Sequence, residues 1–177
     1  MKSTVVGISD CQTCAEAGGE LVTYALGSCI AVSAWDPSRR IGGLLHFMLP
    51  DSGLDARRAE QNPCMFADTG IPRLLDSLAR QGADRRRLII TLTGGAQVLD
   101  PQRVFDIGRR NHLAAKKTLW KLGAMVAAEE VGGTVSRTVR LNVDTGRLGI
   151  REGGGTEKEL SPRAGKEVAN GVSRVGR

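Results

Sequence analysis

The stretch LGSCIAVSAWDPSRRIGGLLHFML, residues 26–49, predicts more about the fold than any other part of the chain. Its residues 30–35 alternate in side-chain character with a period of two, which is typical of a β-strand. Asp36-Pro37-Ser38 has the composition of a turn, and the apolar run over residues 41–49 predicts a second strand. We therefore expect this stretch to form a β-hairpin.

Further strands and helices are predicted on both sides of the hairpin. The expected strands are residues 4–8, 21–26, 88–92 and a short one at Val126, with a second hairpin over residues 138–150. Helical spacing predicts helices over residues 71–78, with Pro72 in the first turn and Gly82 just after the end, and over residues 112–122. The irregular order of strands and helices predicts an α+β fold of mixed, largely antiparallel sheets, hairpin-rich and sandwich-like, flanked by helices.

The length of 177 residues predicts one domain, and 41% hydrophobic residues are too many for a disordered chain. No apolar run reaches the roughly 18 residues of a membrane span, and the 23 glycines lack the period of collagen. The composition changes at Arg151, where the chain becomes rich in glycine and loses its aromatic residues. We therefore expect a folded domain over residues 1–151 and a disordered tail over residues 152–177.

The charge balance is 25 Lys and Arg against 19 Asp and Glu, or +6, which favours an acidic partner. The basic residues form scattered pairs and the chain has 3% aromatic residues, so nucleic-acid binding has only the charge in its favour. The N-terminal residues lack the apolar core and cleavage site of a signal peptide. These features predict a cytoplasmic protein whose four cysteines stay reduced, with no insertion into a membrane.

Thr23, Cys29 and His46 form the cluster that most clearly points to chemistry. Cys29 follows a Gly-Ser turn at the mouth of a predicted strand, and hairpin pairing brings His46 within side-chain reach of its thiol. A neighbouring imidazole can take the thiol proton and hold thiolate and imidazolium as an ion pair. A lone cysteine among small apolar residues is nevertheless more often core, and a histidine on an apolar strand is more often structural. The residues alone leave both interpretations open.

The chain resembles the chemoreceptor glutamine deamidases of the CheD family. The matching motifs run in the same order over residues 4–151. They are Leu26-Gly27-Ser28-Cys29-Ile30-Ala31-Val32, Asp36, Gly43, His46-Phe47-Met48-Leu49-Pro50, Gly94-Gly95-Ala96, Ile107-Gly108, Arg110-Asn111, Val131-Gly132-Gly133 and Arg137. The resemblance implies a CheD-like fold with Cys29, His46 and Thr23 as the catalytic residues.

The resemblance also implies the reaction and its partners. The reaction is hydrolysis of the side-chain amide of glutamines on methyl-accepting chemotaxis receptors, through a thioester on Cys29 and with Thr23 orienting His46. Backbone N–H groups around Gly27, Ser28 and Cys29 are expected to hold the oxyanion. A receptor glutamyl methyl ester is a second expected substrate. No cofactor or metal is implied. The competing hypothesis is a non-catalytic adaptor that binds receptors or a CheC-type phosphatase.

The other cysteines and the second histidine allow weaker hypotheses. Cys11-x-x-Cys14 has the spacing of half a zinc site or of a redox pair, but no second pair follows, so we favour a mobile N-terminal segment. Cys64 is expected to pack in the core. His112 is expected near a helix cap or at the surface, and Gly94-Gly95-Ala96 is expected to pack closely beside the catalytic cluster.

Overall fold

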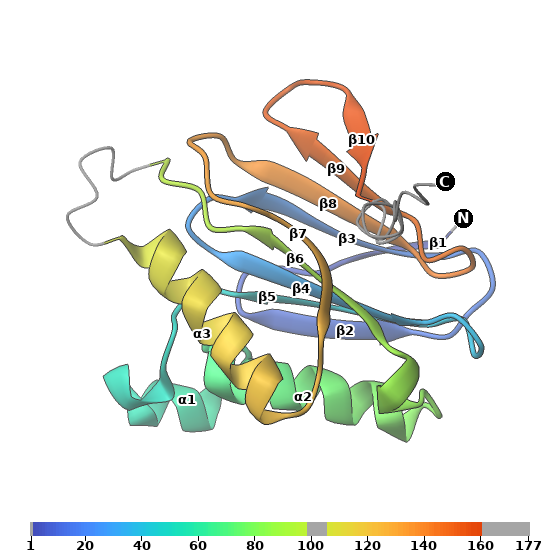
Figure 1. The fold of residues 1–177 in the computed structure, drawn as a ribbon, viewed down its shortest axis with the longest axis horizontal. Coiled ribbons are helices and arrows are strands. Elements are labelled where there is room, and N and C mark those ends of the chain that lie inside the picture. Colours follow the sequence, from blue (N-terminus) through green and yellow to red (C-terminus); the bar gives the residue numbers. More distant parts are fainter. Residues whose placement is uncertain (1, 99–105, 161–177) are drawn as a thin grey trace, which may run out of the picture.

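The computed structural model describes residues 2–98 and 106–160 (Figure 1). The described strands form two five-stranded sheets, ordered β1-β3-β8-β9-β10 and β2-β5-β4-β6-β7. The strands are β1 (Lys2–Val5), β2 (Asp10–Cys14), β3 (Gly19–Leu26), β4 (Ile30–Asp36), β5 (Ile41–Phe47), β6 (Ile89–Gly94), β7 (Val126–Val131), β8 (Arg137–Asn142), β9 (Leu148–Glu152) and β10 (Glu157–Glu159). The helices are α1 (Ala56–Gln61), α2 (Ala67–Arg80) and α3 (Ile107–Lys121), with short 3-10 turns at Ser52–Leu54, Pro63–Met65 and Arg85–Arg87.

The two sheets pack face to face, and the helices cover the outer face of the second sheet (Figure 1). Alternation along β4 and β5 fills both interfaces, because successive side chains of a strand point to opposite faces. Ala31 and Leu44 point toward the first sheet, whereas Val32 and Leu45 pack beneath α2 and α3. The result is a three-layer α+β fold of mixed, largely antiparallel sheets, as the sequence predicted. None of the helices in the described ranges is long and apolar enough to cross a membrane.

The central hairpin is confirmed, and its register fixes the position of His46. β4 and β5 pair from Ile30 opposite Phe47 to Asp36 opposite Ile41, so that His46 lies opposite Ala31. The second hairpin, of β8 and β9, is confirmed as well. Gly82 has φ +97° and directly follows the residue that caps α2, as expected for glycine at a helix end.

Four local expectations differ from the structure. Residues 10–14 form strand β2, because they pair with the edge of β5 although their own sequence lacks an alternating pattern. α2 begins at Ala67, so Pro72 lies inside the helix rather than in its first turn. α3 begins at Ile107, which places His112 within the helix. β10 pairs with β9 beyond the expected domain boundary at Arg151, and residues 161–177 of the expected tail lie outside the described ranges.

Candidate active site

The loop of residues 27–29 joins β3 to β4, and hydrogen bonds that its carbonyl groups accept hold it in place. The Ala96 amide donates to Gly27 at 2.8 Å, the Gly95 amide to Cys29 at 2.8 Å, and the Asn111 side chain to Ser28 at 2.9 Å. A planar trans peptide directs each carbonyl and the following N–H to opposite sides. The N–H groups of Ser28 and Cys29 therefore point away from these donors, and neither donates to another described backbone carbonyl.

His46 meets Thr23 across the interface between the two sheets. The Thr23 hydroxyl lies 2.8 Å from Nδ1 of His46 and donates its single proton to the carbonyl of Val6 at 2.7 Å. Since that proton is already committed, hydrogen accounting assigns the proton of this contact to Nδ1, which donates to Thr23. The lone pair of the imidazole is then on Nε2, which is buried and has no hydrogen-bond partner among the described residues.

The electrostatics favour a neutral pair at rest. Burial raises the pKa of the Cys29 thiol above its ordinary value and lowers the pKa of His46 to about 4. Both shifts are opposite in sign to those that a resting thiolate–imidazolium pair requires, so they favour the neutral pair. At neutral pH the site holds a thiol and a neutral imidazole whose Nε2 can accept a proton.

Cys29 and His46 lie on the same side of the second sheet. Cys29 is two residues before Ala31, which faces His46 across the hairpin, and residues two apart on a strand share a face. Cys29 also packs against the cluster between the sheets. The structure thus brings Thr23, Cys29 and His46 to one end of the interface between the sheets, without a hydrogen bond between the thiol and Nε2.

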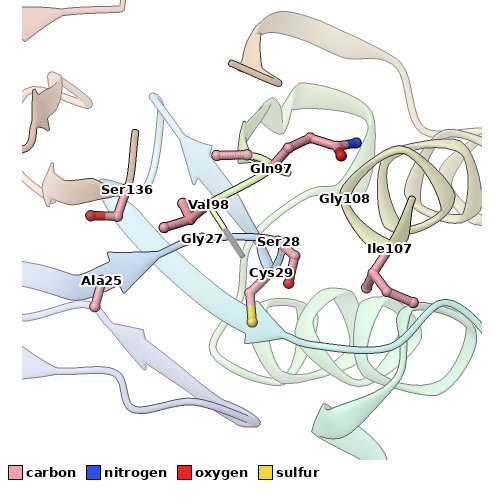
Figure 2. A pocket seen from close by; sticks show the side chains of 10 residues that line it. Ala25, Gly27, Ser28, Cys29, Gln97, Val98, Ile107, Gly108 and Ser136 are labelled. Carbon is pink, nitrogen blue, oxygen red and sulfur yellow. The ribbon is translucent and has the colours of Figure 1, made fainter. Parts of the chain in front are cut away.

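A pocket of about 560 Å³ opens at the Gly27–Cys29 loop. Figure 2 shows this loop on one side of the pocket and Ile107 and Gly108 of α3 on the other. The lining residues are Ala25, Gly27, Ser28, Cys29, Ala96, Gln97, Val98, Ile107, Gly108 and Ser136. All of them are uncharged, so the described wall of this pocket suits a neutral group.

Asn111 connects the nucleophile loop to the end of the His46 strand, and sequence reasoning gave it no role. Its side-chain amide donates to the carbonyls of Ser28 and Met48, both at 2.9 Å, and it is fully buried. Because both partners are carbonyl oxygens, which only accept, the side-chain atom that faces them must be the nitrogen. The other atom, Oδ1, has no hydrogen-bond partner among the described residues. The position of Asn111 within the matched motif Arg110-Asn111 was the only signal that could have indicated it.

Glycines allow α3 and β6 to approach this loop. A Cβ on Gly108 would lie 2.3 Å from the carbonyl oxygen of Gly95, and a Cβ on Gly94 would lie 2.3 Å from that of Cys29. Gly94 also has φ +116°, a conformation that side chains disfavour. The expected close packing of the Gly94-Gly95-Ala96 segment beside Cys29 is confirmed.

The remaining cysteines and His112 lie elsewhere. Cys11 packs on the helical side of β2 and Cys14 on the side facing the first sheet, so the two thiols cannot share a ligand. Cys64 is buried in the core, as expected. His112 contacts Glu129 through Nε2 at 3.0 Å. Within residues 2–98 and 106–160, no three His, Cys, Asp or Glu side chains gather as metal ligands would.

Comparisons with known proteins point to one family. The sequence profile of a family described as "CheD chemotactic sensory transduction" matches residues 48–152. A protein of Solibacter usitatus, named probable chemoreceptor glutamine deamidase CheD, is 54% identical over 162 residues, 92% of this chain and 95% of that protein. Similarly named proteins of Syntrophus aciditrophicus and Pyrococcus horikoshii are 45% and 38% identical, covering 90% and 86% of this chain and 100% and 93% of their own.

Proposed function

The chain belongs to the CheD family, and from this premise we propose that it hydrolyses the side-chain amide of glutamines on chemotaxis receptors, producing glutamate and ammonia. The observation that supports this most is the Thr23–His46 contact, which leaves Nε2 as an unprotonated base on the side of the sheet that carries Cys29. We place the reaction in the cytoplasm, where thiols stay reduced.

The proposed chemistry begins with a proton transfer. As the sulfur of Cys29 attacks the amide carbon, Nε2 of His46 takes the thiol proton, so that a thiolate forms only when substrate is present. The N–H groups of Ser28 and Cys29 stabilise the tetrahedral oxyanion. The imidazolium then protonates the departing nitrogen, which leaves as ammonia, and a thioester remains on Cys29.

Water completes the cycle. His46, neutral again, takes a proton from water as the oxygen attacks the thioester carbon. The carbon–sulfur bond breaks, the thiolate recovers the proton from the imidazolium, and glutamate is released. Thr23 keeps the ring in place because its hydroxyl accepts from Nδ1 while it is itself anchored to the Val6 carbonyl.

The uncharged pocket bears on the choice of substrate. A carboxamide and a methyl ester are both neutral, whereas the carboxylate product would lose hydration without meeting a cation in the described lining. This observation favours glutamyl methyl ester hydrolysis as a second activity of the same site, and it favours release of glutamate in both reactions.

The test is direct conversion of a receptor. The full chain is incubated with a receptor cytoplasmic fragment, and Gln-to-Glu conversion is mapped by mass spectrometry; a methylated fragment tests ester hydrolysis. We expect conversion by the native chain and none by Cys29→Ala or His46→Ala, with Cys11→Ala and Cys14→Ala as active controls. Binding without conversion by the native chain would instead support the adaptor hypothesis, in which a CheC-type phosphatase is the further partner.

A further inference from the structure

The outward side of α3 carries an apolar ridge. Leu113 is 55% exposed and Trp120 is 78% exposed, and their spacing of seven residues places them on one side of the helix. These side chains take no part in the two hydrophobic clusters of the described core. A tryptophan left this exposed is a frequent anchor of protein interfaces.

Basic residues flank the ridge on both sides. Helical geometry places Arg109 and Lys116 along one side and Arg110, Lys117 and Lys121 along the other. Arg109 and Lys116 pair with Asp106 and Glu129, at 3.8 and 3.7 Å. The three basic residues of the other side are exposed and form no ion pair with a described residue. The helix itself contains no Asp or Glu, so every charged side chain on its outward face is basic.

A groove of about 400 Å³ runs beside this face and bears on the kind of partner. Its lining includes Arg110, Leu113 and Lys117 from α3 together with Asp51 and Asp68. The two carboxylates repel any anionic partner that covers the groove, so they disfavour a flat anionic membrane, which would cover the whole face, more than a narrow helix that contacts the ridge. A single helix can instead contact the ridge and place one side chain in the groove.

The same helix forms one wall of the active-site pocket. Ile107 and Gly108, at the start of α3, line the pocket that contains Cys29, and Figure 1 shows α3 running away from that end of the sheets. Fifteen helical residues extend about 22 Å. A partner helix of a few turns can therefore contact the ridge and still deliver a side chain to the pocket.

We propose that the outward face of α3 docks an acidic amphipathic helix of the substrate protein, so that one of its glutamines reaches the pocket at the start of α3. Leu113 and Trp120 provide the apolar contact, and Arg110, Lys117 and Lys121 provide charge complementarity. This inference rests on the proposed function for the identity of the substrate.

The experiment measures binding and chemistry separately. Two variants are made in a Cys29→Ala background, which prevents turnover. One carries Trp120→Ala, and the other combines Arg110→Glu, Lys117→Glu and Lys121→Glu. The affinity of each for a receptor cytoplasmic fragment is measured. We expect each to weaken binding by at least about tenfold. The matched control is Arg39→Glu with Arg40→Glu, at the turn between β4 and β5 and thus at the far end of β4 from Cys29. It should bind like the parent.

With Cys29 intact, the α3 variants should raise KM for the fragment while conversion of a short, unstructured glutamine peptide is unchanged. Unchanged fragment binding and KM in these variants would overturn the docking site and leave the proposed deamidation standing. If the α3 variants lose binding but the native chain converts no glutamine, the docking site would stand and the proposed deamidation would be overturned. Binding of the native chain to vesicles of phosphatidylcholine and phosphatidylserine, but not to the fragment, would also overturn the proposal.

Discussion

The hydroxyl of Thr23 has two tasks, and substitutions separate them. It accepts from Nδ1 of His46 and donates to the Val6 carbonyl, so Thr23→Ser should retain most activity. Thr23→Val has a similar shape but leaves both partners without a hydrogen bond, at a cost of about 1–3 kcal/mol for each buried polar group. We expect Thr23→Val to lower kcat with little change in KM, measured on the receptor fragment. Equal activity of the two variants would contradict an orienting role.

Burial of His46 makes stability depend on pH. Its pKa is about 4 in the folded state against 6.5 for the unperturbed group, so the unfolded chain binds a proton more readily. The stability that comes from a neutral His46 is fully present above about pH 6.5 and is lost as the pH falls towards 4. The loss in unfolding free energy is about 2 kcal/mol at pH 5. Urea unfolding at pH 7 and pH 5 should show this loss in the native chain, beyond that of His46→Gln.

The same pKa predicts where activity falls, since the acid limb of kcat/KM reports the free enzyme's base. That limb should lie near pH 4. An acid limb near 6.5, or identical pH dependence of stability in His46→Gln, would show that His46 is not buried as a neutral base.

The raised pKa of Cys29 predicts its reactivity. Only the thiolate is alkylated, so iodoacetamide should modify Cys29 slowly at pH 7, and the rate should rise about tenfold per pH unit below the thiol pKa. Mass spectrometry of the peptide that contains Cys29 measures the rate at each pH. Rapid modification at pH 6–7 that does not change with pH would instead indicate a resting ion pair with His46.

The sequence indicated Thr23, Cys29 and His46 but not Asn111, for a physical reason. Cys29 and His46 belong to one hairpin, whose register follows from local pattern, and the family resemblance gave Thr23 its role. Asn111 reaches Ser28 only because α3 packs closely against Gly95, which depends on a glycine at position 108. A contact between residues 83 positions apart has no local pattern.

At the scale of elements, sequence patterns predicted the hairpins and missed the pairings between distant segments. β4–β5 and β8–β9 are antiparallel neighbours joined by short turns, so turn composition and alternation define them. The parallel pairs β1–β3 and β6–β7, and the edge strand β2, acquire their partners only through the tertiary fold. The mobile segment expected around Cys11 and Cys14 was wrong for the same reason, since residues 10–14 form an edge strand, on which residues three apart face opposite sides.

β10 extends the folded domain beyond residue 151. It pairs with β9, its glutamates face Arg140 and Arg147, and the amide of Leu160 donates to Leu148 at 2.9 Å. Leu160 also packs against the cluster between the sheets. A chain ending at Glu152 should therefore lose about 2 kcal/mol of unfolding free energy, whereas one ending at Leu160 should keep that contribution. Thermal unfolding compares the three, and equal stability of the Glu152 ending would contradict a structural role for β10.

For the whole molecule, the net charge of +6 matters through its distribution. The described pocket lining is uncharged, whereas Arg110, Lys117 and Lys121 on the outward face of α3 form no ion pair with a described residue. Salt screens exposed charges, with a Debye length of about 10 Å at 0.1 M and about 3 Å at 1 M. Binding of an acidic substrate should therefore weaken with salt, while the chemical step in the neutral pocket should not.

Steady-state kinetics on the receptor fragment at low and high salt test this separation. We expect KM to rise about tenfold between 0.05 and 0.5 M salt, with kcat nearly constant. In the variant that combines Arg110→Glu, Lys117→Glu and Lys121→Glu, the rise of KM with salt should be smaller, because the charges that salt would screen have been reversed. The control variant, Arg39→Glu with Arg40→Glu, reverses two positive charges on another part of the surface. Its KM should depend on salt as the KM of the native chain does. A slope that follows net charge in both variants alike would assign the effect to the whole surface and not to α3.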